Sequence, residues 1–181
     1  MDPRLQDLID HHEIRQLLCR YCQGSDRFDA ERMAGVFHSA SWVDHAHTHS
    51  PGPAFVEEAI PAQVAHVSLV WHQLGQSFIT VAGDEATAET YLLVAYRGRG
   101  PDETLLTLMG GRFLDTLRRD EGLWKIAKRL QVRDWSYSHR VDQDTVAQAG
   151  FFEGSPSGDD PFYSFFCLAH SGPFAAHGDG P

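Results

Sequence analysis

The stretch of the chain richest in metal-binding side chains covers residues 44–49 and reads Asp-His-Ala-His-Thr-His. If this stretch is a β-strand, alternation would place its three histidines on one face. Imidazole and carboxylate groups are common zinc ligands, so His45 and His47 could hold a metal ion. No further carboxylate or histidine with metal-motif spacing accompanies them, however. We therefore expect no metal, and favour a solvated strand end with one histidine or Asp44 facing a pocket.

Cysteines form the second group with reactive potential. Cys19 and Cys22 have Cys-x-x-Cys spacing, and Cys167 follows far downstream. A zinc site would need a second such pair, and a thioredoxin-like site would need a preceding strand of a β-α-β unit. The sequence has neither feature, because the pair lies in a segment with helical periodicity. We expect free thiols, as in a reducing compartment.

Composition narrows the classes of function. The chain has 181 residues, of which 42% are hydrophobic and 22% charged, and its formal net charge is −10. The acidic balance argues against nucleic acid or an anionic membrane as a partner. The first residues carry acids and histidines without a long apolar run, which argues against a signal peptide or a membrane span. These features lead us to expect a cytoplasmic protein with a small-molecule substrate.

The elements that would position reactive groups follow from apolar periodicity. Helices are predicted over residues 4–23, 29–37 and 51–69, with Gly24 ending the first, Asp29 capping the second and Pro61 bending the third. A short strand is predicted over residues 41–47. Asp26 would then lie in the loop 25–28, between the first two helices.

From about residue 72 onward the pattern becomes that of long β-strands. Four strands are predicted over residues 72–81, 86–97, 104–119 and 123–136, separated by short turns rich in glycine and aspartate. Joined by hairpins, they form a meander. Three helices packed on one face of a strongly bent antiparallel sheet would leave a cavity between the two layers. We expect an α+β domain over residues 1–140.

The remaining residues, 141–181, have the composition of a tail. They contain the aromatic residues Phe162, Tyr163, Phe165 and Phe166 among glycine, serine and proline. Leaving such a cluster exposed is unfavourable, so we expect it to cover the pocket mouth or a subunit interface. Fraying of the final residues is the alternative.

Three phrases of the sequence resemble the SnoaL-like branch of the nuclear-transport-factor-2 (NTF2-like) superfamily, over about residues 5–140. They are IRQLLCRYCQGSDRFDAERMAGVF, WHQLGQSFITVAGDEATAETYL and GRFLDTLRRDEGLWKIAKR. This branch includes scytalone dehydratase, bile-acid dehydratase and hexachlorocyclohexane dehydrochlorinase. The resemblance implies a cone-shaped fold, chemistry without a cofactor, and assembly as a homodimer or homotrimer.

The resemblance also implies a catalytic pair. In lyases of this family an aspartate just after the first helix orients a histidine at the start of the first long strand, and that histidine removes a proton from the substrate. Asp26 and His72 match these places. Neutral imidazole suits a base near neutral pH, and a carboxylate on its other nitrogen fixes the tautomer and stabilises the imidazolium. The alternative is that Asp26 caps the second helix and His72 is a structural residue.

Further site residues follow from the same resemblance. Arg129 falls where the dehydrochlorinase has a pocket arginine, and Arg20 where it has a lysine; either could stabilise a leaving anion or an oxyanion. Tyr21 lies near a tyrosine of the dehydratases and could donate a hydrogen bond to a substrate carbonyl. The alternatives are arginines paired with acids such as Asp115 or Asp134, and a tyrosine that only packs in the core.

Substrate contacts are also expected at the pocket walls, from Trp42, Asp44, Phe113 and Trp135. The leading hypothesis is a cofactor-independent lyase of the dehydratase type, or an isomerase, acting on a small aromatic, steroid-like or alicyclic compound. The alternative is a non-catalytic binding or scaffold subunit, such as the small subunit of a ring-hydroxylating dioxygenase, because the fold alone does not determine function.

Overall fold

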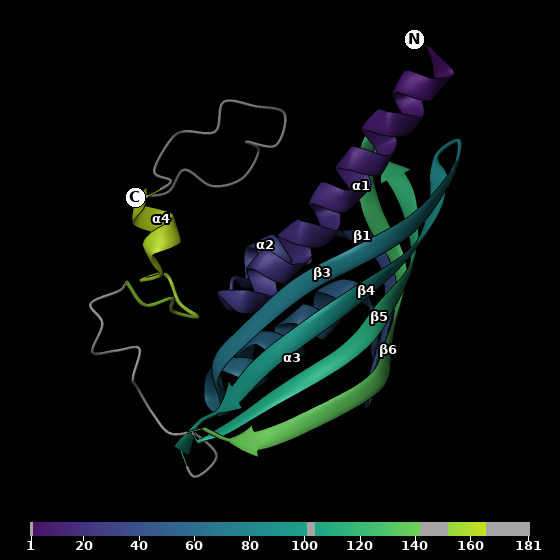
Figure 1. Ribbon diagram of the computed structural model, residues 1–181. Coiled ribbons are helices and arrows are strands. Elements are labelled where there is room, and N and C mark those ends of the chain that lie inside the picture. The colour runs from purple at the N-terminus through teal and green to yellow at the C-terminus, as the bar shows by residue number, and fades with distance from the viewer. Residues whose placement is uncertain (1, 101–103, 142–151, 166–181) are drawn as a thin grey trace.

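The computed structural model of the chain describes residues 2–100, 104–141 and 152–165. The elements are α1 (Pro3–Asp26), α2 (Ala30–Ala34), β1 (Phe37–His45), β2 (Thr48–Ser50), α3 (Gly52–His66), β3 (Val67–Ala82), β4 (Glu85–Gly98), β5 (Leu105–Asp120), β6 (Leu123–Arg140) and α4 (Pro161–Phe165). The strands form one curved, open sheet, and α1, α2 and α3 lie on one side of it (Figure 1). The predicted α+β fold, with helices on one face of a bent sheet, is confirmed.

The sheet has the strand order β2-β1-β6-β5-β4-β3. Its four long strands, β3 to β6, pair antiparallel in chain order, so the predicted meander is present. The pairing of β1 was not predicted: β1 joins β6 in parallel, with Val43 opposite Arg129. This pairing brings the end of β1 beside the middle of β6.

Helix α1 runs past Gly24, so the predicted end at that glycine is wrong. The amide of Asp29 donates to the Gly24 carbonyl at 2.9 Å and that of Phe28 to the Ser25 carbonyl at 3.3 Å, with Phe28 at φ 53°. These two bonds and the left-handed residue make a Schellman ending. Asp26 therefore belongs to the last turn of α1 and not to the loop.

Gly24 has a different use from the one predicted. A Cβ atom at this position would lie 2.7 Å from the backbone nitrogen of Met33, so the absence of a side chain lets α2 pack closely on α1. Phenylalanine, not glycine, occupies the left-handed position 28, at a cost of roughly 1–2 kcal/mol. The ring of Phe28 packs against the hydrophobic core, and this burial offsets the strain.

The second and third helices are shorter than predicted. Helix α2 ends at Ala34, because Phe37 is already the first residue of β1, and α3 ends at His66, because β3 begins at Val67. Pro61 lies inside α3. Within the described ranges, no helix combines the length and the apolar character that a bilayer crossing requires.

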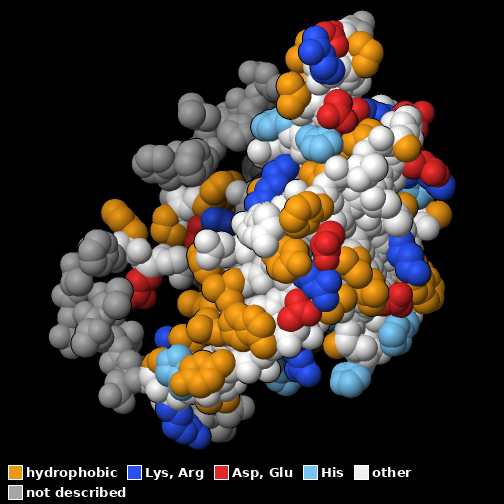
Figure 2. All heavy atoms as spheres, turned by 45° about the vertical axis from the view of Figure 1, so that its right-hand side comes forward, with side chains coloured by type: hydrophobic (Ala, Val, Ile, Leu, Met, Phe, Trp, Pro, Cys, Tyr) orange, Lys and Arg blue, Asp and Glu red, His pale blue; other side chains and the backbone are white. Residues whose placement is uncertain are grey.

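The two faces of the sheet differ in what covers them. Inward-facing residues of the strands pack on apolar residues of the helices, such as Ile14 and Leu18 of α1, which are fully buried. The outer face has no helix over it in the described part of the chain, and hydrophobic side chains lie in patches across it (Figure 2). The large ones are exposed by 37–62%: Trp42, Leu69, Trp71, Phe78, Tyr91, Leu130, Trp135 and Tyr137. Apolar patches of this kind are typical of interaction surfaces.

We expect the outer face to mediate self-association. Phe78→Glu places a charge on its most exposed aromatic position, which is 62% exposed, and should lower the molar mass measured by size-exclusion chromatography with light scattering. Leu8→Glu is the matched control, because Leu8 is a 67% exposed leucine on α1, away from the sheet. A monomeric wild-type protein, or an assembly unaffected by Phe78→Glu, would contradict this expectation.

Candidate active site

Asp26 and His72 lie side by side between α1 and β3. His72 Nδ1 is 2.6 Å from Asp26 Oδ1, and the backbone amide of His72 donates to Asp26 Oδ2 at 3.2 Å. Because the carboxylate accepts both bonds, Nδ1 carries the proton and Nε2 is the nitrogen with a free lone pair. Nε2 has no hydrogen-bond partner among the described residues. The pair is therefore arranged as a base and its orienting carboxylate.

The side chains of His72 and Asp26 are 10% and 17% exposed, so the pair lies below the surface but is not sealed. His72 points toward the helices because its strand partner Val94 is a buried, inward-facing residue of β4. Asp26 reaches it from the last turn of α1. The end of one helix and one inward position of a strand thus create the pair.

Arg129 forms a second polar group, deeper in the protein. Its Nε and Nη2 atoms donate to the two oxygens of Asp115 at 2.7 and 2.8 Å, and both side chains are 0% exposed. The guanidinium carbon lies 4.1 Å from the ring centre of Tyr21 and 3.9 Å from that of Phe113. Burial opposes the charge on Arg129, but Asp115 outweighs it, and the pKa of Arg129 lies above its ordinary value. The site therefore contains a permanent cation.

One nitrogen of this cation makes no hydrogen bond to the described residues. That nitrogen is Nη1 of Arg129, which is buried. Leaving a charged donor unpaired in a protein interior is unfavourable, unless a ligand supplies the acceptor. Tyr21 is a second donor nearby, because burial raises the pKa of its phenol to about 12 and keeps it protonated. An oxygen or halide of a bound molecule is the kind of group that such donors stabilise.

Two further residues lie near the pair: His45, one of the residues from which a pocket-facing side chain was expected, and Cys22, which was expected only to be a free thiol. His45, the last residue of β1, contacts the ring of Phe55 at 5.3 Å. Burial lowers its pKa, with Arg129 and His72 adding to the effect, so His45 is neutral near neutral pH. Strand alternation from the buried Val43 was the signal that could have placed His45 inside.

Cys22 lies one helical turn before Asp26 and interacts electrostatically with both Asp26 and Arg129. Burial raises the pKa of its thiol to about 12, which excludes a reactive thiolate at neutral pH. Both Cys19 and Cys22 are free thiols, as predicted, and the former is exposed. Cys167 lies outside the described residues.

Three expected wall residues lie on the wrong side of the sheet. Val43 and Arg129 are paired and buried, so the neighbours of Val43 along β1, Trp42 and Asp44, point outward. Trp42 Nε1 donates to Asp44 Oδ1 at 3.0 Å on that outer face. Trp135 is 51% exposed and packs over Gly110 on the same face. These three residues do not face His72, and placing them at the pocket was wrong.

The other expected contacts separate into two groups. Phe113 faces inward, is 1% exposed and packs its ring against Tyr21 at 5.5 Å. Arg20 lies on the α2 side of α1, since burial and the charge of Arg32 lower its pKa. Burial and, to a lesser extent, the charge of Arg20 lower the pKa of Lys125. The structure thus groups Tyr21, Phe113 and Arg129 together, and Arg20 with other cations.

The expected alternation of the histidines is also wrong. Ala46 takes φ 53° and turns the chain from β1 into β2, so His45, His47 and His49 do not share one face. His49 Nδ1 instead lies 2.9 Å from Asp44 Oδ1, on the outside. Among the residues that the structure describes, no group of three or more potential ligands is gathered for a metal.

A surface hollow of about 510 Å³ lies elsewhere, at the start of α1 and the β3–β4 turn. It contains the ion pair of Asp10 and Arg119 and is lined by Pro3, Gln6, Asp7, Asp10, Val81, Gly83, Asp84 and Arg119. Asp10 precedes Asp26 by more than four turns of α1, roughly 24 Å along the helix axis. This hollow is therefore separate from the Asp26–His72 pair.

Comparisons with known proteins identify the family of the chain and agree with its fold. Residues 6–130 match the sequence model of the SnoaL-like domain. No curated protein matches the sequence significantly.

Several solved structures share the fold. A proposed scytalone dehydratase from Novosphingobium aromaticivorans is 17% identical with a TM-score of 0.67, covering 75% of this chain and 91% of that one. A proposed aromatic ring hydroxylase from the same species is 22% identical with a TM-score of 0.66, covering 74% and 94%. A hexachlorocyclohexane dehydrochlorinase of type 3 from Novosphingobium barchaimii is 15% identical with a TM-score of 0.66, covering 77% and 99%.

The buried ion pair gives a test of the site's interior. Asp115→Leu leaves the Arg129 charge unpaired and should destabilise the protein by about 3–5 kcal/mol in urea unfolding. Asp115→Leu combined with Arg129→Met removes both charges and should recover most of that loss. A single variant as stable as wild type would show that Asp115 does not compensate the Arg129 charge.

Proposed function

This chain belongs to the SnoaL-like domain family, and from that premise we propose that it is a cofactor-independent lyase whose base is His72. The observation that carries the proposal is the contact between Asp26 and His72 at 2.6 Å. It leaves one imidazole nitrogen free to accept a proton, in a position shielded from most of the solvent. General-base action of this kind contributes roughly 10²–10⁴-fold to a reaction rate.

The proposed reaction is an elimination. His72 Nε2 takes a proton from a carbon next to a carbonyl group, and the electrons of that C–H bond form the new double bond. The leaving hydroxyl departs with its bonding electrons and receives the proton back from the His72 imidazolium, so water is released. Asp26 stabilises the imidazolium in between. Arg129 Nη1 and the Tyr21 hydroxyl stabilise the negative charge that develops on the carbonyl oxygen.

The interior favours a small, flat or alicyclic substrate. Phe37, Phe55 and Phe113 pack around Tyr21 and His45 by edge-to-face and tilted ring contacts. Aromatic walls of this kind bury apolar ring surfaces, while the few polar groups select the orientation. The two enzymes with this fold named above, a proposed scytalone dehydratase and a dehydrochlorinase, support an elimination of water or halide. Isomerisation by the same base is a variant of this proposal.

A non-catalytic binding or scaffold subunit is the second candidate, because a shared fold does not determine function. A proposed aromatic ring hydroxylase also has this fold. A scaffold subunit has no need of a histidine–carboxylate pair or of a buried cation with an unpaired donor. Because the chain has both groups, the lyase proposal ranks first.

Dehydration of a panel of cyclic β-hydroxy-carbonyl compounds, followed by mass spectrometry, tests the proposal. His72→Ala should lower kcat/KM by about 10²–10⁴-fold because the base is lost. His66→Ala is the matched control, since His66 is an exposed histidine at the end of α3. Full activity in His72→Ala would disprove the role of this base. Binding of panel compounds without any turnover by the wild-type protein would instead favour the subunit.

A further inference from the structure

The turn after Asp26 is short and strained. Only residues 27–29 separate the end of α1 from the start of α2, and the middle one, Phe28, has φ 53°. The last turn of α1 contains no basic side chain to stabilise its carbonyl groups. Any movement of this turn would carry the Asp26 carboxylate away from His72, because Asp26 is the last residue of α1. Contacts that hold the turn therefore bear on the geometry of the pair.

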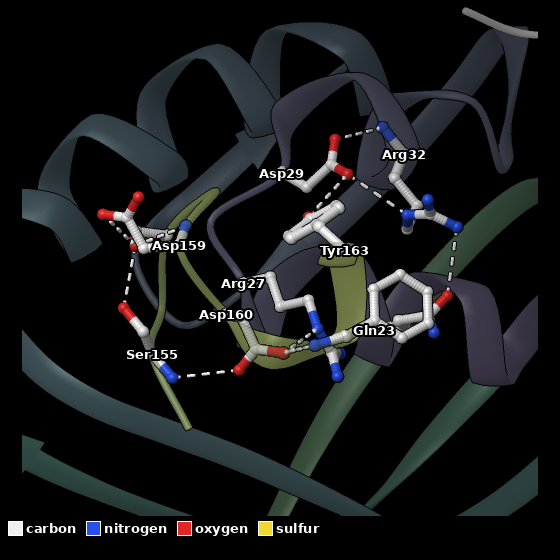
Figure 3. Close-up of polar contacts among 10 residues, drawn as sticks. Gln23, Arg27, Asp29, Arg32, Ser155, Asp159, Asp160 and Tyr163 are labelled. Carbon is white, nitrogen blue, oxygen red and sulfur yellow. Dashed lines mark hydrogen bonds and ion pairs between the residues drawn. The ribbon is translucent and has the colours of Figure 1, made fainter. Parts of the chain in front are cut away.

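A segment near the C-terminus contacts the residues on both sides of Phe28. We call residues 155–163 the strap; they lie beside the junction of α1 and α2 (Figure 3). Asp160 Oδ1 accepts from Arg27 Nε at 3.3 Å. The hydroxyl of Tyr163 donates to Asp29 Oδ2 at 3.2 Å. The strap thus holds the residue before Phe28 and the residue after it.

Stacking of an aromatic ring on two guanidinium groups adds to these contacts. The centre of the Phe162 ring lies 4.5 Å from the guanidinium carbon of Arg27 and 5.7 Å from that of Arg32. Arg32 in turn binds Asp29 at 3.1 Å and Gln23 of α1 at 3.1 Å. The strap therefore contacts a network that already joins α1 to the first turn of α2 (Figure 3).

Asp160 is the centre of the strap. It accepts hydrogen bonds from the amides of Ser155 and Phe162, each at 2.9 Å, as well as from Arg27. Burial opposes its charge, but these donors outweigh it and lower the pKa of Asp160, so the group is ionised at neutral pH. Burial and the Asp29 carboxylate raise the pKa of Tyr163, which stays a donor. The Asp160 carboxylate therefore both stabilises the fold of the strap and binds the strap to the α1–α2 turn.

We propose that the strap is a positioning element for the Asp26–His72 pair, with Asp160 and Tyr163 acting through Arg27 and Asp29 to hold the last turn of α1. Its significance for catalysis rests on the proposed function, but its effect on the geometry of the pair does not. The strap lies outside residues 6–130 that match the SnoaL-like domain.

The test measures the pair directly and needs no substrate. Protein with ¹⁵N-labelled histidine is compared by NMR for wild type, Asp160→Asn, Tyr163→Phe and the double variant, with the His72 signals assigned from His72→Gln. The proton on His72 Nδ1, bonded to Asp26, should shift or broaden in Asp160→Asn and most in the double variant. Asp159→Asn is the matched control and should leave the signal unchanged, because the hydrogen bonds of Asp159 within the described ranges go to Ser157 of the strap and not to the α1–α2 turn.

Amide hydrogen exchange at Phe162 and Tyr163 reports whether the strap has been released. Faster exchange in the double variant with an unchanged His72 signal would overturn the proposal, because the Asp26–His72 hydrogen bond would then keep its geometry without the strap. Unchanged exchange in the double variant would also overturn it, since the named contacts would not be what holds the strap.

If the dehydration assay detects turnover, the double variant should lower kcat about tenfold with little change in KM, as expected for lost positioning. Absence of turnover in the wild-type protein would count against the lyase and leave the NMR result valid. The two proposals can therefore fail separately.

Discussion

The site depends on one carboxylate that binds one residue twice. Asp26 accepts the ring proton of His72 through one oxygen and the backbone amide of the same residue through the other. The backbone bond fixes the height of Asp26 along β3, and the ring bond fixes the rotation of the imidazole. A carboxylate with both oxygens committed has little freedom, so the free nitrogen of His72 keeps one direction. The end of α1 is consequently part of the chemical site.

This arrangement explains why so much of the structure gathers at the α1–α2 junction. The Schellman ending puts Asp26 in helical geometry but requires a left-handed residue two positions later. Gly24 allows α2 to pack against the same turn, and the strap holds Arg27 and Asp29 from outside. Backbone strain next to a functional residue persists only where surrounding contacts over-determine it. Here the contacts come from both ends of the described chain.

The second constraint is a charge in the interior. Arg129 lies between two aromatic rings with Asp115 as its counter-ion, and desolvating two charges is expensive unless their hydrogen bonds are well formed. The bidentate geometry meets that condition for two guanidinium nitrogens and leaves the third without a protein partner among the described residues. Cys22 and His45 lie between these two polar groups, since each interacts electrostatically with Arg129 and with one member of the Asp26–His72 pair.

Apolar periodicity along the sequence predicted the α+β fold class and the four-strand meander, because it is a local signal. The resemblance to the SnoaL-like branch pointed to Asp26 and His72, and the structure brings these two side chains together. The sequence did not determine which face of the sheet Trp42, Asp44 and Trp135 occupy. That choice depends on the parallel pairing of β1 with β6, a contact between segments far apart in the chain. A shift of one residue in a strand reverses the direction of every side chain. The contact of the strap with Arg27 likewise joins segments far apart in the chain, so the sequence could not show it. The counter-ion of Arg129 was open between Asp115 and Asp134, and the pairing of β5 with β6 places Asp115 opposite it.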